Sequence, residues 1–538
     1  MSCRAWYRCA LPSWQVNREV GERGRVGRVA ITIRALLQGA PALASRVQVY
    51  GDEGVAIDAI TYDSRAAAPG TLFVALRGAA VDGYRFIGGA LDRGAAAILA
   101  EAPVDDPRAR CTIVAGDSRA ALAELANAFY RAPSRELGLI GVTGTKGKTT
   151  TSFLIEWILA GRYRTGLIGT VDLKVGPRRW RNPAHQTTPE SLEVQRLLRE
   201  MVDAGVDWAV LETSSHALAT SRVTGCAYDL AAITNVTHEH LDFHGTYERY
   251  LEAKASLFDR IAPVGAKSPD RPRGVAINLD DPGAATLIGR ARGVPEWTYG
   301  LSPAAQVRAE AIVADGAGMA ATLQSPWGGA RLRVPLLGRF NIANVLAAAT
   351  VCLLAGVSLD LLAARLADFP GVPGRLQRID CGQPFLTVVD YAHNPDSLGQ
   401  VLGLLRGVTG GRLIALFGSG GERDVAKRAL MGATCARLAD FGIFTDEDPR
   451  GEDAASIVKQ IAAGATSVGW REGEHSARIA DRREAIAHAC GMARPGDTVV
   501  LAGKGHEQTI IYADRTIPWD ETAEAHRALA QLGYGAAI

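Results

Sequence analysis

Residues 141–150 read Gly141-Val142-Thr143-Gly144-Thr145-Lys146-Gly147-Lys148-Thr149-Thr150. An apolar run at 137–140 precedes this stretch and is typical of a short strand, while the apolar spacing of residues 151–160 predicts a helix. A strand, a glycine-rich loop and a helix in this order place backbone N–H groups around a phosphate. The standard pattern G-x-x-x-x-G-K-[ST] is not met in full, because Val142 stands at its first position.

The residue types of this loop suit a nucleoside triphosphate. Gly144 and Gly147 let the backbone approach a phosphate closely, and Lys148 supplies a positive charge for the β- and γ-phosphates. Thr149 supplies a hydroxyl for Mg²⁺. The sequence therefore predicts that ATP or a similar triphosphate reacts here; the plain alternative is a glycine turn with an exposed lysine.

Composition narrows the class of protein. A chain of 538 residues is too long for one core and predicts three or four domains. The 59 basic and 57 acidic residues nearly balance, so the net charge predicts no nucleic-acid partner. The sequence contains no apolar run of about 18 residues, so we expect no membrane insertion. The eight cysteines lack CxxC spacing, so we expect a reducing cytoplasm rather than a disulfide or zinc scaffold.

The first 29 residues differ from the rest. They carry arginines without clear periodicity and no signal-type apolar core, so we expect a disordered tail or an overlong start, with the folded part opening near Ile31. From there short β-rich runs alternate with helical patterns, and several runs end in Gly, Asp, Glu or His, which predicts doubly wound α/β sheets with sites at the strand ends. The predicted strands are 98–99, 139–142, 208–211, 230–234, 275–277, 386–389, 413–417 and 498–501.

Polar residues near the loop extend the predicted site. Glu212 ends an apolar strand, where a carboxylate can hold Mg²⁺ opposite the loop hydroxyl. Residues 238–244 hold three histidines and two carboxylates, a set that can bind a metal. Lys254 lies on the apolar face of a helix predicted at 247–258, and such a lysine normally extends its ammonium group to water.

The last third has more polar strand ends. Asp390 and His393 follow one strand, and residues 417–424 form a second glycine-rich turn. Three carboxylates and Arg450 gather at 445–450, and residues 502–507 again close a strand with glycine, a base and an acid. These turns predict a part of the chain that closes over ATP and a second substrate, which would exclude water from a reactive intermediate.

Taken together, these motifs resemble those of the Mur ligase family from about Ile31 to the C-terminus. Their order carries the resemblance: Tyr62-Asp63-Ser64-Arg65, the loop 144–150, Glu212 with Ser214-Ser215-His216, His240-Leu241-Asp242-Phe243-His244-Gly245, Lys254, Asn341 with Asn344, Asp390-Tyr391-Ala392-His393, 418–424 and Gly503-Lys504-Gly505-His506-Glu507. The resemblance implies an α/β protein of three domains: a UDP-sugar-binding domain at 30–136, a central P-loop-type ATPase domain at 137–368 and a C-terminal Rossmann-like amino-acid-binding domain at 369–538.

Within the family, the motif set is most similar to ligases that add the third amino acid to UDP-N-acetylmuramoyl-L-alanyl-D-glutamate in peptidoglycan synthesis. The resemblance implies ATP and Mg²⁺ as cofactors, activation of a substrate carboxylate as an acyl phosphate, and displacement of phosphate by an amine. Mg²⁺ and Lys148 would offset charge on the transferred phosphoryl group. It also implies that Lys254 is carbamylated, and that the carbamate joins Thr149, Glu212 and His240 around the metal, with Lys148, Lys254, His240 and Glu212 as the catalytic set. We expect a cytoplasmic monomer.

The resemblance also assigns binding residues. It places ATP at Gly144, Thr145, Lys146, Gly147, Lys148, Thr149, Thr150, Asn341, Arg375 and His393. It places the UDP-muramoyl-dipeptide at Ser64, Thr187, Thr188, Ser214 and Arg222. It places the incoming amino acid at Arg423, Glu447, Asp448, Pro449, Arg450, Gly503 and Glu507.

Three positions depart from the family pattern. Lys146 stands where Asn is common, and Thr220 stands where a dipeptide-contacting Gln is common. Asp448 replaces the Asn associated with meso-diaminopimelate; it adds negative charge and favours an ammonium group, whereas Arg450 can still pair with a carboxylate. The sequence leaves meso-diaminopimelate, L-lysine and L-ornithine open. Two other functions also remain: a related ligase such as a folylpolyglutamate synthetase or another Mur enzyme, and a nucleotide-binding switch or transport ATPase.

Overall fold

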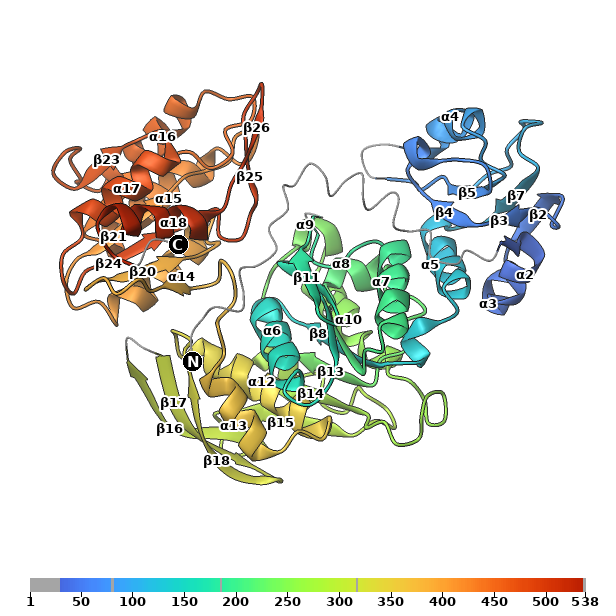
Figure 1. Cartoon of the computed structure of the whole chain (residues 1–538), viewed down its shortest axis with the longest axis horizontal. Helices are drawn as coiled ribbons and strands as arrows, with labels where there is room; N and C mark the ends of the chain where they lie inside the picture. The colour runs from blue at the N-terminus through green and yellow to red at the C-terminus, as the bar shows by residue number, and fades with distance from the viewer. Residues whose placement is uncertain (1–29, 79–81, 184–185, 316–317, 536–538) are drawn as a thin grey trace. The chain divides into compact units, whose positions relative to one another are not determined.

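The computed structural model describes residues 30–78, 82–183, 186–315 and 318–535 (Figure 1). The predicted N-terminal tail, 1–29, lies outside these residues. The chain divides into two compact units. One comprises the chain up to Ser134 together with Pro189–Arg199 and Ala219–Cys226, and the other comprises Arg135–Thr188, Glu200–Leu218 and Ala227–Ile538.

The first unit contains a five-stranded sheet in the order β2-β7-β6-β5-β4. Its strands β4 to β7 are parallel and β2 is antiparallel to β7. All residues of β5 and β6 are buried, as expected for inner strands that are covered on both faces. The elements are β1 (Ile31–Thr32), α2 (Ile33–Gln38), α3 (Pro41–Ala44), β2 (Gln48–Gly51), β3 (Ala56–Ile57), β4 (Ala59–Thr61), η1 (Ser64–Ala66), β5 (Thr71–Val74), η2 (Gly83–Phe86), α4 (Ile87–Asp92), β6 (Ala97–Ala100), β7 (Cys111–Val114) and α5 (Ser118–Phe129).

The second unit holds an eleven-stranded sheet in the order β11-β10-β9-β12-β8-β13-β14-β15-β16-β17-β18. The neighbours in the run β9-β12-β8-β13-β14-β15-β16 pair in parallel, whereas β10 and β11 at one end and β17 and β18 at the other pair antiparallel. The strands are β8 (Gly138–Thr143), β9 (Thr165–Ile168), β10 (Asp172–Val175), β11 (Arg178–Arg181), β12 (Trp208–Glu212), β13 (Leu230–Ile233), β14 (Gly274–Asn278), β15 (Glu296–Gly300), β16 (Val307–Asp315), β17 (Gly318–Ser325) and β18 (Gly328–Val334).

Strand order makes β8 the topological switch of this sheet. The chain leaves β8 toward β9 and β12 on one side and returns to β13 on the other. Ligands of open α/β sheets bind outside the carboxyl ends of the strands at such a switch, which here is the end of β8 where the phosphate loop begins. The fold therefore puts the loop at the position that suits a ligand.

Helices cover this sheet according to their apolar faces. α12 (Phe340–Leu354) is apolar on nearly all sides and packs against both α6 (Lys148–Leu159) and α13 (Leu359–Ala367) (Figure 1). The other helical segments from residue 133 up to the start of α12 are η3 (Pro133–Arg135), α7 (Ser191–Asp203), α8 (Ser215–Ala219), α9 (Leu241–His244), α10 (Tyr247–Ala255), η4 (Phe258–Arg260) and α11 (Pro282–Ala285).

A six-stranded sheet follows in the order β19-β20-β24-β21-β22-β23, parallel except for β19. Alternate residues of β21 enter different cores: Ala415 and Phe417 pack with α14 to α16, whereas Ile414 and Leu416 pack with α17 and α18. This period of two explains why every residue of β21 is apolar. The elements are β19 (Gln377–Ile379), β20 (Leu386–Val389), α14 (Pro395–Arg406), β21 (Leu413–Phe417), α15 (Ala426–Leu438), β22 (Phe441–Phe444), α16 (Ala454–Thr466), β23 (Ser476–Arg478), α17 (Arg482–Met492), β24 (Thr498–Leu501), β25 (Thr509–Ile511), β26 (Thr516–Pro518) and α18 (Glu521–Gln531).

The predicted fold class and all eight predicted strands are confirmed; three strands match at both ends, and no end of the others shifts by more than one residue. The helix predicted at 151–160 begins earlier, at Lys148, because the loop itself forms the first turn. The helix predicted at 247–258 ends at Ala255, and a short 3₁₀ turn follows. None of the described helices has the length and apolar character that a membrane span requires. The six cysteines in the described part of the chain are free thiols.

Candidate active site

The phosphate loop is shaped by two glycines. Gly144 and Gly147 have φ values of +145° and +84°, a region that side chains with a Cβ rarely adopt. A Cβ on Gly144 would overlap Thr234 Oγ1, and a Cβ on Gly147 would overlap Asn344 Oδ1. Both positions therefore require glycine for two independent reasons, backbone conformation and space. Gly147 caps α6, so the N-terminal N–H groups of this helix face the loop.

A hydroxyl and a carboxylate meet beside this loop. Glu212 is fully buried at the end of β12, and its Oε2 accepts hydrogen bonds from Thr149 Oγ1 at 3.0 Å and Thr170 Oγ1 at 2.8 Å. The backbone N–H of Thr170 donates to Glu212 Oε1 at 3.1 Å. Burial raises the pKa of Glu212, whereas the Thr170 bonds and the Lys148 charge act against that rise. The pair of Thr149 and Glu212 fits the hydroxyl and carboxylate that hold Mg²⁺ in phosphate-loop enzymes.

Two lysines converge on one carbonyl of the loop. Lys148 Nζ donates to the carbonyl oxygens of Gly144 and Thr145 at 3.0 and 2.9 Å, and Lys254 Nζ donates to that of Gly144 at 2.7 Å. Lys254 is 1% exposed, so the expectation that this lysine reaches water is wrong. The apolar face of α10 points inward here, and Lys254 Nζ lies 4.4 Å from the centre of the Tyr250 ring.

Burial decides the charge of these lysines. Desolvation lowers the pKa of Lys148, with Glu239 and Glu212 opposing the shift. Desolvation lowers the pKa of Lys254 well below its usual value, and the neighbouring charge of Lys148 lowers it further. A lowered pKa shifts an amine toward its neutral form, which is the nucleophilic form.

His240 lies at the edge of this arrangement. It has φ +57°, its side chain is 45% exposed, and its Nε2 lies 3.7 Å from Glu239 Oε2. Its ring stands edge-on to His216 at 4.7 Å. Within the described ranges no three His, Cys, Asp or Glu side chains converge as a metal site. Among the four predicted metal ligands, only Glu212 and His240 have a carboxylate or imidazole side chain. A metal ion at this site would therefore also need the Thr149 hydroxyl and a modified Lys254.

The other predicted nucleotide residues lie in two places. Asn341, on α12, donates to Leu337 O at 2.8 Å and accepts from Asn344 Nδ2 at 2.7 Å. Beside the six-stranded sheet, the Arg375 guanidinium lies 4.8 Å from the Tyr391 ring centre, and His393 Nδ1 lies 2.9 Å from Tyr391 O. Lys146 N donates to Asn235 Oδ1 at 2.8 Å, and Thr150 is half-buried in α6.

The predicted dipeptide residues fall in both compact units. In one unit Thr188 is buried, its hydroxyl donates to Glu212 O at 2.7 Å and accepts from Ser214 N at 3.1 Å, and Thr187 beside it is half-buried. In the other, Ser64 opens the short helix η1, and Arg222 Nε pairs with Glu190 Oε1 at 3.2 Å. The hydrogen bond from Thr188 to the end of β12 fixes residues 187–188 beside the strand that carries Glu212.

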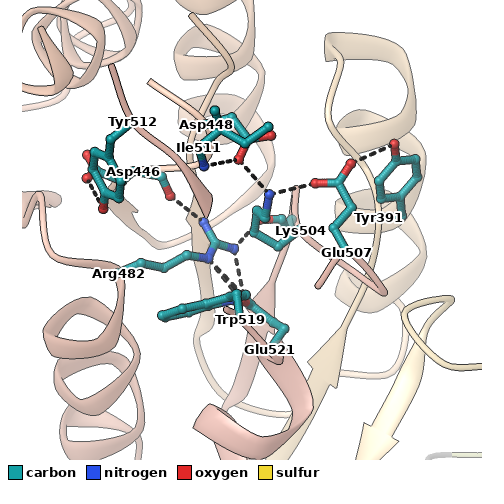
Figure 2. A network of polar contacts seen from close by, with 11 residues as sticks. Tyr391, Asp446, Asp448, Arg482, Lys504, Glu507, Ile511, Tyr512, Trp519 and Glu521 are labelled. Atoms are coloured by element: carbon teal, nitrogen blue, oxygen red, sulfur yellow. Dashed lines mark hydrogen bonds and ion pairs between the residues drawn. The ribbon is translucent and has the colours of Figure 1, made fainter. Parts of the chain in front are cut away.

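Six of the seven predicted amino-acid residues follow the carboxyl ends of β22 and β24, and Figure 2 shows two of them, Asp448 and Glu507. Glu447 and Arg450 follow β22, and Arg450 has φ +55°. A Cβ on Gly503 would lie 2.8 Å from Glu447 Oε2, so glycine there leaves room for the carboxylate. Pro449 packs its carbonyl against Gly421 of the second glycine-rich turn, whereas Arg423 is exposed on that turn.

Three buried polar atoms of this cluster lack a hydrogen-bond partner among the described residues. Glu447 Oε2, Arg450 Nε and Ser419 Oγ make no hydrogen bond within the described part of the chain. Burial raises the pKa of Glu447, and the charges of Lys427 and Lys504 oppose the rise. A buried carboxylate oxygen and a buried guanidinium nitrogen without partners are costly unless a ligand supplies them.

Sequence reasoning missed three residues of these sites. Thr170 follows β9 without any motif, so only the fold could bring it to Glu212. Tyr250 forms a 2.8 Å hydrogen bond with Thr145 Oγ1 and lies under Lys254; its place on the apolar face of α10 was the one available signal. Lys504 stands inside a quoted motif, yet its role as a partner of Asp448 follows only from the structure.

Comparison with known proteins agrees with this geometry. Three family models match the chain: Mur ligase family, catalytic domain, at 56–130; Mur ligase middle domain at 142–352; and Mur ligase, glutamate ligase domain, at 374–505. The chain is 50% identical over 486 residues to the UDP-N-acetylmuramyl-tripeptide synthetase of Roseiflexus sp. (strain RS-1), covering 89% of this chain and 96% of that protein.

Two further relatives extend the comparison. The chain is 46% identical over 482 residues to the UDP-N-acetylmuramoyl-L-alanyl-D-glutamate--2,6-diaminopimelate ligase of Geobacillus kaustophilus (strain HTA426), covering 89% of this chain and 96% of that protein. A solved structure of a UDP-N-acetylmuramoyl-L-alanyl-D-glutamate--2,6-diaminopimelate ligase superposes with a TM-score of 0.66 at 31% identity, over 94% of this chain and all of that one. This similarity over most of both chains shows that the protein belongs to the Mur ligase family of ATP-dependent ligases.

Proposed function

We propose that the protein adds a diamino acid to UDP-N-acetylmuramoyl-L-alanyl-D-glutamate, with ATP, in peptidoglycan synthesis. The names of the relatives support this substrate over folate, and a ligase over a nucleotide switch. The observation that carries the proposal is the buried arrangement of Thr149, Glu212, Lys148 and Lys254 at the switch point of the central sheet. It combines a phosphate loop with groups that stabilise charge on a transferred phosphoryl group.

The phosphate loop would hold ATP. Residues 144–150 would surround the β- and γ-phosphates with backbone N–H groups, and Lys148 would turn from the loop carbonyls to the phosphate oxygens. Asn341, Arg375 and His393 would contact the rest of the nucleotide. Mg²⁺, held by Thr149 and Glu212, would neutralise charge on the phosphates.

Lys254 would act as a carbamate. Burial lowers the pKa of its amine, and the neutral form of that amine would attack CO₂ to give a carbamate and release one proton. The product is an anion, which suits a site next to Lys148 far better than a second ammonium group. With Glu212 and His240 it would complete the oxygen and nitrogen donors for the metal.

The reaction would proceed through an acyl phosphate. A carboxylate is a poor electrophile, so transfer of the γ-phosphoryl group to the glutamate carboxylate supplies a leaving group. The amine of the diamino acid then attacks the carbonyl carbon, and inorganic phosphate leaves. Thr187, Thr188, Ser214, Arg222 and Ser64 would hold the UDP-muramoyl-dipeptide. The hydrogen bond of Thr188 to Glu212 O would couple substrate position to the metal site.

The cluster after β22 and β24 would hold the diamino acid. Glu447 Oε2 would accept an ammonium group and Arg450 would pair with a carboxylate, because both are buried with unused hydrogen-bonding atoms. A diamino acid that carries both groups at its distal end satisfies both residues, which favours meso-diaminopimelate over L-lysine and L-ornithine. Asp448, Pro449, Gly503, Glu507 and Arg423 would complete this site.

The proposal includes the expected domains, 30–136 for the UDP-sugar, 137–368 for ATP and 369–538 for the amino acid. It also includes a monomer in the cytoplasm. Purified protein with ATP, Mg²⁺ and UDP-N-acetylmuramoyl-L-alanyl-D-glutamate should release phosphate only when a diamino acid is added. Absence of release with meso-diaminopimelate, L-lysine and L-ornithine alike would refute the proposal, and equal release without any amino acid would indicate an ATPase.

A further inference from the structure

A buried ammonium group lies between two carboxylates of the amino-acid cluster. Lys504, after β24, is fully buried; its Nζ lies 2.9 Å from Asp448 Oδ1 and 2.6 Å from Glu507 Oε2 (Figure 2). Both carboxylates belong to the predicted amino-acid site. Lys504 was assigned no role by the motif pattern.

Each carboxylate is also held by a second donor. The backbone N–H of Ile511 donates to Asp448 Oδ1 at 3.0 Å, and Tyr391 OH donates to Glu507 Oε1 at 3.2 Å. The Asp448 side chain is 14% exposed and that of Glu507 is 24% exposed, so this charge cluster is largely shielded from water. Their charges therefore act on a neighbouring ligand more strongly than exposed charges would.

The ion pair with Lys504 changes the effect that we expect Asp448 to have on substrate choice. From sequence alone, Asp448 brings an extra negative charge that favours an ammonium group. In the structure that charge is offset by Lys504, and Asp448 Oδ1 is already occupied by two donors. Glu447 Oε2, Arg450 Nε and Ser419 Oγ are buried atoms of this cluster without a hydrogen-bond partner in the described part of the chain, so they remain available to a ligand.

We propose that Lys504 is a specificity-determining positioning residue, which sets the charge balance of the amino-acid site in favour of a diamino acid with a distal carboxylate. This inference rests on the proposed function. Lys504, Asp448 and Glu507 together carry one net negative charge. Without the Lys504 ammonium the same groups carry one more negative charge, which repels a distal carboxylate and attracts a lone ammonium.

Substitutions that change charge in opposite directions test this role. We expect Lys504→Met to lower the ratio of kcat/KM for meso-diaminopimelate to that for L-lysine by about tenfold, because the site becomes more negative. We expect Asp448→Asn, which leaves Lys504 paired with Glu507, to raise the same ratio by about tenfold. The double variant should return the ratio to near the value of the unsubstituted enzyme.

The measurement is phosphate release by the full chain with ATP and the UDP-dipeptide in excess. An amino acid that is not turned over is measured as a competitor of the other. Lys459→Met serves as the matched control, since Lys459 is exposed on α16 and the variant changes net charge equally. Its ratio should stay within about twofold of that of the unsubstituted enzyme, as expected for a distant screened charge.

The outcomes separate specificity from folding. Equal loss of activity with both amino acids would show that Lys504 has only a structural role and would overturn the proposal, as would shifts of the opposite sign. If Lys504→Met does not fold, the ratio measured for Asp448→Asn alone decides whether the charge balance sets specificity. Asp448→Asn is expected to fold because Lys504 stays paired with Glu507. An unsubstituted enzyme inactive with every diamino acid would refute the proposed function itself, whereas an active enzyme with unchanged ratios would refute only the role of Lys504.

Discussion

The turn after β8 and the turns after β22 and β24 both place polar groups at the carboxyl ends of parallel strands, but they do so with different charges. Beside β8, Lys148 and Lys254 share a loop carbonyl, and Glu212 accepts hydrogen bonds from the Thr149 and Thr170 hydroxyls and from Thr170 N–H. Beside β24, Lys504 lies between two carboxylates, and Arg482 pairs with Glu521 (Figure 2). The first region leaves Lys148 and the N–H groups at the start of α6 for an anionic ligand, whereas the second pairs its charged side chains with one another.

This contrast predicts which residues are needed for activity and which for stability. In the phosphate-loop region, removal of a charged group should stop the reaction with little loss of folding. In the amino-acid region, removal of one partner leaves another buried charge without compensation, which destabilises the fold.

The largest effect is expected at Lys254. Lys254→Ala should lower kcat by about a thousandfold or more, because it removes the group proposed to complete the metal site. Short carboxylic acids such as acetate should restore part of the activity by replacing the carbamate. Phosphate release with and without acetate measures both effects, and Lys459→Ala, on an exposed face of α16, is the control. Full activity of Lys254→Ala would contradict the carbamate role.

The next effect is on stability, at the buried pair of Arg482 and Glu521. Both side chains are 0% exposed, and the guanidinium also donates to Asp446 O at 2.9 Å and Ala502 O at 2.7 Å. Glu521→Gln should destabilise this region by about 3–5 kcal/mol, because the Arg482 charge stays buried without its partner. Hydrogen exchange of the amides in α17 and α18 measures the change.

An exposed pair supplies the comparison for that experiment. Glu472→Gln removes the partner of Arg478, where both side chains are roughly half exposed. Its effect on hydrogen exchange should stay below about 1 kcal/mol, as is usual for surface ion pairs. Equal effects of the two substitutions would contradict the distinction between buried and exposed pairs.

A smaller loss is expected from Gly147→Ala. The new Cβ would overlap Asn344 Oδ1 at a backbone φ of +84°, so the loop must shift away from its phosphate-binding form. We expect kcat/KM for ATP to fall by about a hundredfold, as when a single group misplaces reacting atoms. Gly469→Ala is a control with positive φ and open space around its Cβ. It should leave the ATP kinetics unchanged.

The smallest effect concerns pH and Lys254. Burial lowers the pKa of this lysine in the folded state, so the unfolded chain binds more protons and the folded state loses stability as pH falls below 10.5. Lys254→Met has no such loss. In carbonate-free buffer, the free energy of unfolding of Lys254→Met should be larger than that of the unsubstituted protein. This difference should increase by about 1 kcal/mol for each pH unit by which the pH is lowered. A difference independent of pH would show that Lys254 keeps its ordinary pKa.

Sequence patterns predicted the strands well because their buried residues are continuous apolar runs bounded by polar turns. They predicted the Thr149 and Glu212 pair because Thr149 belongs to the phosphate-loop motif and Glu212 ends an apolar strand. They could not predict Thr170, whose position against Glu212 depends on β9 lying beside β12. The burial of Lys254 was equally hidden, since an amphipathic helix shows its apolar face in sequence but not whether a lysine on that face reaches water.

The sequence by itself determined the α/β class, the phosphate loop and the order of motifs that resembles the Mur ligase family, because these depend on local spacing. Only the tertiary structure decided the burial of Lys254, which lowers its pKa, and the pairing of Asp448 with Lys504. Both depend on which groups a buried side chain meets from distant parts of the chain. Desolvation and pairing are set by three-dimensional neighbours, and a linear pattern contains neither.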